Sequence, residues 1–154
     1  MEHSYNQPSD IFPEQPLTVY AGFWQRLAAS ILDGLIVGVP VGILGYIIED
    51  RSEPATGLFE IYASPGNLLN IVAAWLYASL LESSPAQATI GKKALGIKVT
   101  DTNGQRISFG RATGRHFGKI ISTIILLIGY FMMLWDDRNQ TLHDKMADTL
   151  IVKR

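Results

Sequence analysis

The sequence contains no cysteine, so disulfide bonds, thiolate catalysis and cysteine-ligated metal centres are excluded. Charge is also sparse, because charged residues make up 18% of the chain against roughly 25% in soluble domains. The net charge of −1 gives no indication of nucleic-acid binding. No cleavable signal peptide is expected, since residues 1–20 carry Glu2, Asp10 and Glu14 and no basic stretch followed by an apolar run. With three prolines, these residues are predicted to form a flexible tail ahead of one domain over residues 21–154.

Apolar residues are abundant, at 47% of the chain, and they gather in three long stretches. The first, over about residues 23–48, is interrupted only by Arg26 and Asp33. As a helix it would reach roughly 39 Å, enough for a bilayer core of about 30 Å. The other two cover about residues 66–82 and 118–135 and are slightly shorter than the usual span of about 20 residues. We therefore predict an all-α membrane protein built from three hydrophobic helical segments.

The two connections between these stretches differ in charge. Residues 49–65 hold four acidic residues and one arginine, whereas residues 83–119 hold seven Lys and Arg residues and one aspartate. Short loops rich in Lys and Arg stay in the cytoplasm. The N-terminus and residues 83–119 are therefore predicted to be cytoplasmic, and residues 49–65 external.

The position of the C-terminus depends on a small β element. Residues 94–100 have the pattern of a strand, and Asn103-Gly104 is a strong turn signal before residues 106–109, so these segments predict a cytoplasmic β-hairpin. Residues 149–153 also have the pattern of a strand. If this last strand pairs with the hairpin, the C-terminus is cytoplasmic and the third apolar segment is re-entrant or a short helical hairpin. A simple third span would instead place the C-terminus outside. We prefer the first arrangement.

Arg26 and Asp33 are the two charges inside the first apolar stretch. They lie seven residues apart on one helix face, with Ser30 between them. Their Cα atoms would be roughly 10 Å apart, too far for an unstrained ion pair. We expect Arg26 to extend to the cytoplasmic interface and Asp33 to find its partner on another segment. Two interpretations of Asp33 stay open: a site that handles an ion or proton, and a buried group that holds helices together.

The same stretch carries Gly34, Gly38 and Gly42, with Gly45 beyond them. Small residues at a spacing of four let helix backbones approach closely, so we predict a helix-packing face. A flexible gate is the alternative. Pro40 removes one backbone hydrogen bond and is expected to kink the helix.

Charged residues outside the apolar stretches are expected at the solvated interface, in topology signals or near lipid headgroups. Glu82, at the end of the second stretch, is expected at the solvated interface. Lys92 lies in residues 89–93, which resemble a phosphate-binding loop but have Ala86 where its first glycine is needed, so nucleotide binding is rejected. The basic residues of this loop are expected to act as a topology signal, with contact to anionic lipid headgroups as the alternative.

Arg111, Arg115 and Lys119 share one face of a helix that leads into the third stretch. They are expected on lipid headgroups, with neutralisation of Asp33 or Glu82 as the alternative. His143 and Asp144 stand side by side, but adjacent side chains point in different directions and no nucleophile accompanies them. The three histidines are isolated along the chain, so neither an enzyme, a metal site nor a cofactor is expected.

Three separated motifs carry a family resemblance. They are Phe23-Trp24-Gln25-Arg26-Leu27-Ala28, Thr89-Ile90-Gly91-Lys92-Lys93-Ala94-Leu95-Gly96-Ile97-Lys98-Val99, and Leu142-His143-Asp144-Lys145-Met146-Ala147-Asp148-Thr149-Leu150-Ile151-Val152. Together with Asp33 they resemble the RDD family of membrane proteins, named for one arginine and two aspartates; here the signature corresponds to Arg26, Asp33 and Asp144. Ala147-Asp148-Thr149 departs from the usual Ala-Gly-Thr, which affects the local turn.

The resemblance implies a multi-pass protein of a prokaryotic cytoplasmic membrane, in a family for which transport, including cation–proton exchange, has been proposed. We therefore expect a small transporter or exchange component in which Asp33 titrates and Arg26 and Asp144 shape its field. Its partners would be the lipid bilayer, a monovalent cation or proton, and a second copy or another membrane protein. A non-transporting scaffold, with the signature residues as structural pins, is the alternative.

Overall fold

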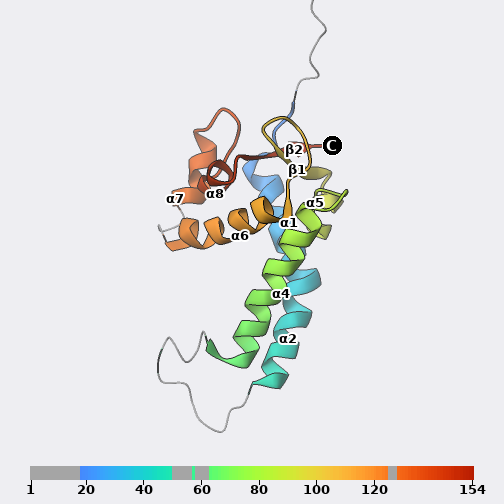
Figure 1. The fold of residues 1–154 in the computed structure, drawn as a ribbon, viewed down its shortest axis with the longest axis vertical. Coiled ribbons are helices and arrows are strands. Elements are labelled where there is room, and N and C mark those ends of the chain that lie inside the picture. The colour runs from blue at the N-terminus through green and yellow to red at the C-terminus, as the bar shows by residue number, and fades with distance from the viewer. Residues whose placement is uncertain (1–17, 50–56, 58–62, 125–127) are drawn as a thin grey trace, which may run out of the picture.

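The computed structural model describes residues 18–49, 57, 63–124 and 128–154. Residues 1–17 of the predicted flexible tail over residues 1–20, and most of the acidic connection, lie outside this part of the chain. Residues 18–20 are described, and the flexible tail does not extend to them, because Lys153 N–H donates to Val19 O at 2.9 Å and Tyr20 forms a bridge with Val152. The described chain is mostly helical, with one small sheet. Two long helices run together, and the remaining short elements gather at one end of this pair (Figure 1). We call that end the head.

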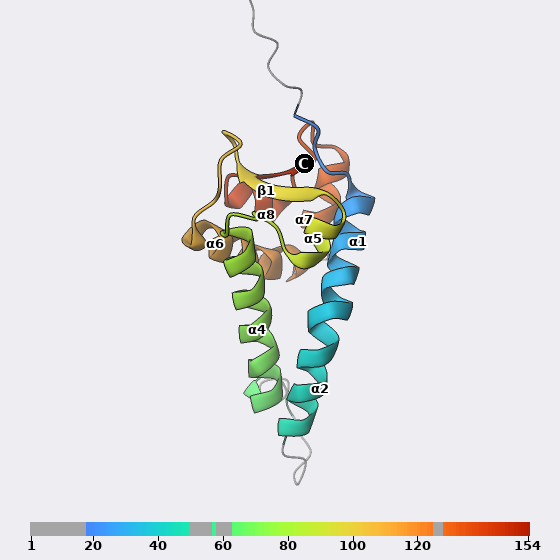
Figure 2. The same ribbon diagram turned by 90° about the vertical axis from the view of Figure 1, so that its right-hand side faces the viewer.

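The first long helix is continuous over α1 (Phe23–Asp33), the π-helical turn η2 (Gly34–Gly38) and α2 (Val39–Ile48) (Figure 2). Its bounds agree with the predicted first stretch. Within the described residues it alone is long and apolar enough to cross a bilayer, and only 6% of its most apolar part is buried. A core helix of a soluble protein would be largely buried, so this exposed apolar surface is typical of a helix in lipid.

The second long helix, α4 (Pro65–Glu82), packs against α2. Its start follows from the sequence, because Pro65 occupies the first turn and Ser64 Oγ accepts the Asn67 N–H at 3.4 Å. At the same end of the pair, Glu49 accepts the Gly66 N–H at 3.2 Å. The two long helices are therefore joined by a direct contact far from the head.

The close approach of these helices occurs at Gly45, the last glycine of the predicted series, and not at Gly34, Gly38 or Gly42. A Cβ on Gly45 would lie 2.8 Å from the carbonyl oxygen of Gly66, whereas a Cβ on Gly34, Gly38 or Gly42 would have no atom within 4 Å. Gly34, Gly38 and Gly42 are therefore not used for close packing among the described residues. The reason is geometric, because the helices converge only toward the end of α2 (Figure 2).

The third apolar stretch does not form a single long span within the described residues, so the alternative of a simple third span is not supported. α6 (Phe109–Ile124) lies across the head end of α4, and α7 (Ile128–Phe131) and the 3₁₀ turn η3 (Met132–Leu134) follow as separate short pieces (Figure 1). α6 is amphipathic: Ala112, Arg115, Gly118 and Ser122 are buried, while Phe117, Ile120 and Ile121 are exposed. A helix with a buried charge on one face is poorly suited to a lipid-surrounded span.

The sheet has two strands, β1 (Ile97–Asp101) and β2 (Thr149–Lys153), paired antiparallel with Val99 opposite Ile151. The predicted pairing of residues 149–153 with the first predicted strand is therefore confirmed. The predicted hairpin is wrong, because residues 105–108 form no strand and Ala94 belongs to the short helix α5 (Ile90–Ala94).

The turn itself forms as expected. Gly104 has a φ of 77°, and the Asp101 carboxylate accepts the N–H groups of Asn103 and Gln105 at 2.9 and 2.8 Å. After the turn the chain buries Ile107 and enters α6. Ile107 is thus held by burial in the core, and its segment forms no strand.

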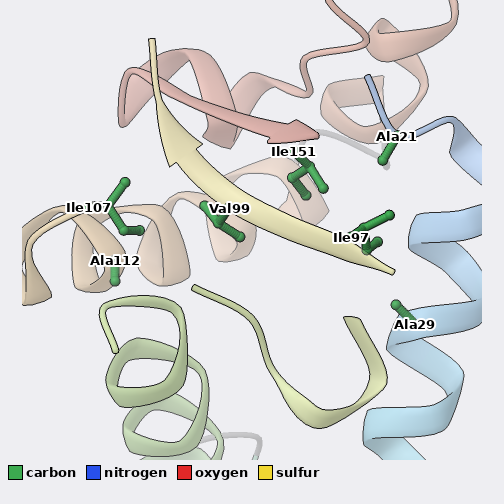
Figure 3. Packing of buried hydrophobic residues seen from close by; sticks show 7 residues of the cluster. All are labelled: Ala21, Ala29, Ile97, Val99, Ile107, Ala112 and Ile151. Atoms are coloured by element: carbon green, nitrogen blue, oxygen red, sulfur yellow. The ribbon is translucent and has the colours of Figure 1, made fainter. Parts of the chain in front are cut away.

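The hydrophobic core lies between the sheet, α1 and α6, and contains Ala21, Ala29, Ile97, Val99, Ile107, Ala112 and Ile151 (Figure 3). The N-terminal approach to α1 joins the sheet, because Ala21 N–H donates to Ile151 O at 2.8 Å. The short helix α8 (Leu142–Met146) precedes β2 and carries a capping box formed by Thr141 and Asp144. Both ends of the described chain therefore lie in the head, as the preferred arrangement of the C-terminus requires.

Candidate functional site

Asp33 ends α1 and is held by three neutral donors. Its Oδ1 accepts the Tyr77 hydroxyl and the Gly91 N–H, both at 2.7 Å, and its Oδ2 accepts the Thr89 hydroxyl at 2.7 Å. No Lys or Arg nitrogen lies within 4.0 Å of this carboxylate in the described part of the chain. Asp33 thus has partners on other segments, as predicted, but none of them carries a positive charge.

The sequence around α5 explains this arrangement. Thr89 is the N-cap of α5, so its hydroxyl and the N–H groups after it face the incoming carboxylate. Gly91 is required because a Cβ there would lie 2.9 Å from Asp33 Cγ. Tyr77 also accepts the Ile90 N–H at 3.0 Å, which orients its hydroxyl. Sequence reasoning missed these partners, although the cap-like Thr89-Ile90-Gly91 pattern was readable.

Asp33 also lines a cleft of about 290 Å³ between the two long helices. We call it the Asp33 cleft. Its other polar groups are Asn70 and Tyr77, both of α4, and its remaining lining is apolar or glycine: Gly34, Val37, Gly38, Val41, Ala73 and Ala74. One carboxylate therefore supplies the only charge in the lining of this cleft. Ser30 does not reach it, because its hydroxyl donates to Arg26 O at 3.0 Å.

Arg26 is paired with the third signature residue. Its NH1 lies 2.5 Å from Asp144 Oδ2, and its Nε donates to Ala21 O at 3.2 Å. The expectation that Arg26 extends to the interface is wrong, since the residue is only 8% exposed. The counter-charge that keeps it inside comes from 118 residues along the chain. Arg26 and Asp33 do not pair with each other, as helix geometry predicted.

A longer chain of alternating charges continues from Asp144. Arg115 binds Asp144 through Nε at 2.9 Å and Glu82 through NH1 at 3.0 Å, and Glu82 also pairs with Lys92. The resulting charge network joins α1, α8, α6, α4 and α5 through Arg26, Asp144, Arg115, Glu82 and Lys92. All five side chains are buried. The assignments of Glu82 to solvent and of Arg115 to lipid headgroups are therefore wrong.

Arg111 differs from these residues. It is exposed, and its NH1 lies 3.8 Å from Asp101, a surface ion pair of little energetic value. The spacing of four that relates Arg111 to Arg115 therefore did not predict a common role. The difference arises because Arg111 lies at the edge of the head and Arg115 faces two carboxylates within it.

Burial and charge set the protonation of the groups in the head. Burial alone would raise the pKa of Asp144, but Arg115 and Arg26 outweigh it and hold this pKa well below its usual range. Burial lowers the pKa of Lys92 to about 8, with Glu82 acting in the opposite direction. Burial also lowers the pKa of His143 to about 3. At neutral pH His143 is therefore neutral, and hydroxyls contact both ring nitrogens, Ser122 at 3.3 Å and Thr141 at 2.9 Å.

The position of Asp144 has a local cause that was visible in the sequence. The Thr141 N–H donates to Asp144 Oδ2 at 3.2 Å, which completes the capping box of α8. This box orients the carboxylate at the helix terminus, where both arginines also contact it. The described residues contain no cluster of three or more His, Asp or Glu side chains suited to a metal ion.

The sequence model of the RDD family matches residues 20–148 of the chain. Among curated proteins, the uncharacterized protein YxaI of Bacillus subtilis is 36% identical, over 86% of this chain and 96% of its own length. The uncharacterized membrane protein YteJ of the same organism is 28% identical, over 86% of this chain and 80% of its own length. A proline-rich antigen homolog of Mycobacterium tuberculosis is 41% identical over 89% of this chain, which spans 56% of that relative. No solved structure matches the chain.

Proposed function

Since the chain belongs to the RDD family, we propose that it is a small multi-pass membrane protein that exchanges a monovalent cation or proton across the bilayer, with Asp33 as the ion-binding carboxylate. A membrane location agrees with the exposed apolar helix over Phe23–Ile48 and with the description of YteJ as a membrane protein. The proposal rests on the carboxylate of Asp33, which lines a cleft between two helices and has no Lys or Arg nitrogen within 4.0 Å among the described residues.

The surroundings of Asp33 suit a cation or proton. Its three donors are neutral, so the negative charge is oriented by hydrogen bonds but remains available to an incoming positive charge. A carboxylate in an otherwise apolar segment costs about 2.5–3.5 kcal/mol on insertion scales, so its retention favours a function. Asn70 and Tyr77 add oxygen ligands of the kind that hard cations bind.

The backbone next to Asp33 is irregular. The π-helical turn η2 spans Gly34–Gly38, directly after the carboxylate and just before Pro40. Such turns are rare and occur frequently at functional sites. Because a Cβ at Gly34, Gly38 or Gly42 would meet no atom within 4 Å, this side of the helix is free for a second copy of the chain. We propose that such a homo-oligomer encloses the ion path.

The proposed topology has the two long helices crossing the membrane as an antiparallel pair, with the head in the cytoplasm. The Lys and Arg residues of segment 83–119 lie in the head, which favours that side. Both termini are then cytoplasmic. α6 would rest at the interface, with Phe117, Ile120 and Ile121 toward lipid and Arg115 toward the head.

The test is proton-coupled cation flux in liposomes that contain the purified protein and a pH-sensitive dye. Wild type is expected to carry flux above protein-free liposomes, and Asp33→Asn to reduce it to that background. Asp137→Asn is the matched control, because Asp137 is an exposed aspartate outside the Asp33 cleft. Wild-type flux from folded Asp33→Asn protein would remove Asp33 from the mechanism.

A scaffold function is the second candidate, and the charge network favours it. Removing one partner of a buried ion pair costs about 3–5 kcal/mol, so in this second proposal Arg26, Asp144 and Arg115 serve as structural pins. If wild type carries no flux, Asp33→Asn lowers the yield of folded protein, and a partner co-purifies in mild detergent, the scaffold is supported instead.

A further inference from the structure

A second cleft, of about 280 Å³, lies near the start of α1 and shares no lining residue with the Asp33 cleft. Four cationic side chains line it: Arg26, Lys92, Arg115 and Lys119. No carboxylate is among its lining residues, since Glu82 and Asp144 pair with these cations without lining the cleft. Its described walls therefore present charge of one sign.

The charges around this cleft do not balance. The four cations face two carboxylates, Glu82 and Asp144, and His143 is a neutral hydrogen-bonded side chain. Lys119 has no carboxylate oxygen within 4.0 Å among the described residues. Arg26, Lys92 and Arg115 are buried and Lys119 is half-buried, and uncompensated charge away from solvent is costly, so an anion bound here would be stabilised.

A specific donor is also left unused. Arg26 NH2 is buried and has no hydrogen-bond partner in the described structure. Arg26 as a whole is only 8% exposed. Buried guanidinium N–H groups are nearly always paired, so an unpaired one indicates a missing acceptor. Arg26 is also one of the residues that line the cleft.

We infer that the cleft lined by Arg26, Lys92, Arg115 and Lys119 binds a phosphate-type oxyanion, either inorganic phosphate or the phosphate of an anionic lipid headgroup. Arg and Lys donors pair strongly with the several oxygens of such an anion. The hydroxyls of Tyr130 and Thr141 are further polar groups in the lining. We call this region the oxyanion cleft.

The two sources share this chemistry but differ in what surrounds it. Phe23, Leu27, Met133 and Ile151 also line the oxyanion cleft, and they would contact the glycerol and first methylenes of a lipid. Free phosphate would use the cations alone. The site goes beyond the proposed exchange function, because neither Asp33 nor any other residue of the Asp33 cleft takes part.

The experiment measures thermal unfolding of the full-length protein in mild detergent. The probes are inorganic phosphate against chloride at equal ionic strength, and short-chain phosphatidylglycerol against short-chain phosphatidylcholine. Stabilisation by phosphate and not chloride supports a free oxyanion, and stabilisation by phosphatidylglycerol and not phosphatidylcholine supports a lipid headgroup. If neither anionic probe stabilises the protein more than its control, the inference is wrong.

Variants show whether the effect belongs to this cleft. Lys119→Gln removes a cation that has no carboxylate partner among the described residues, and is expected to weaken the apparent affinity about tenfold, the usual effect of one charged contact. Lys119→Arg keeps the positive charge and is expected to retain binding. It therefore shows whether a loss of binding in Lys119→Gln is due to the charge or to misfolding. Lys93→Gln is the matched control, because Lys93 is exposed on α5 beside Lys92 and does not line the cleft.

Equal affinity of Lys119→Gln and wild type would place the anion elsewhere and overturn the inference. Asp33→Asn is expected to bind the anionic probe as wild type does. Loss of flux in Asp33→Asn and loss of anion binding in Lys119→Gln are therefore separate results, so either proposal can fail while the other stands.

Discussion

At the scale of single residues, Asp144 organises the head. Each of its carboxylate oxygens binds a different guanidinium, and Arg26 and Arg115 approach from separate helices. Its neighbour His143 is instead held neutral by burial, with Thr141 and Ser122 on its two nitrogens. Two adjacent polar residues thus differ in charge, one neutral and one negative, because different groups surround them.

The state of His143 makes stability depend on acid pH. Its pKa is lowered from 6.5 to about 3 on folding, so the unfolded chain binds more protons between these values. Stability is therefore lost as pH falls below about 6.5. Between pH 7 and pH 5 we expect a loss of about 2 kcal/mol in the free energy of unfolding, as an upper value.

The measurement is chemical denaturation in detergent at several pH values. His143→Gln is expected to remove most of the change between pH 7 and pH 5, while His116→Gln, which keeps His143, retains most of it. Stability of wild type that is flat over this interval would show that His143 is charged or accessible. The lowered pKa of Asp144 also makes the folded protein less stable as pH falls, but only below about pH 4.

At the scale of elements, the turn from α8 into β2 contains the residue that departs from the family pattern. Asp148 stands where the family usually has glycine, and its φ is 49°, in the left-handed region. The Asp148 N–H donates to Lys145 O at 3.3 Å, so the turn forms with the unusual residue. Glycine is favoured at such a position because it has no Cβ to strain the backbone.

Asp148→Gly is expected to stabilise the protein by about 0.5–1 kcal/mol, since it relieves left-handed strain at an exposed site. A higher midpoint of thermal unfolding in detergent would show this. Asp148→Ala keeps the Cβ and loses the tolerance of Asp for this region, so it is expected to destabilise. A midpoint for Asp148→Gly below that of wild type would mean that the carboxylate contributes more than the strain costs.

At the scale of the whole molecule, apolar surface and charge are separated. The long helix of α1, η2 and α2 exposes many large apolar side chains, among them Ile31, Leu35, Ile36, Val39, Ile43, Leu44, Ile47 and Ile48. The buried charges instead gather in the head, with the sheet and both described ends of the chain (Figure 2). Such a division suits a protein with one part in lipid and one in water.

Single cysteines test the proposed topology, because the native chain has none. Thr102→Cys and Lys153→Cys are both exposed in the head and are expected to react with a membrane-impermeant maleimide only after the cells are opened. Ser52→Cys, in the acidic connection, is expected to react in intact cells. The cysteine-free wild type gives the background.

Reaction of Lys153→Cys but not Thr102→Cys in intact cells would contradict the pairing of β1 with β2. Reaction of both from outside would keep the fold and reverse its orientation. The labelling pattern therefore tests the fold and the direction of insertion separately.

Sequence alone determined the features that depend on neighbouring residues. The apolar run of residues 23–48 specified the first long helix, Ser64-Pro65 specified the start of α4, and the apolar pattern of residues 149–153 specified the last strand. The family signature was also readable, since its three motifs stand in order. Each of these depends on helix or strand periodicity or on capping, which are local properties of a chain.

Only the tertiary structure decided which partners these elements and charges meet. β1 pairs with residues about fifty positions away and not with residues 106–109, because Ile107 is buried in the core instead. Arg26 meets Asp144 across 118 residues, and Asp33 meets α5 through neutral donors. The spacing of residues along the chain does not indicate which distant residues will be in contact. They depend on which arrangement buries the apolar side chains while leaving each buried charge a partner.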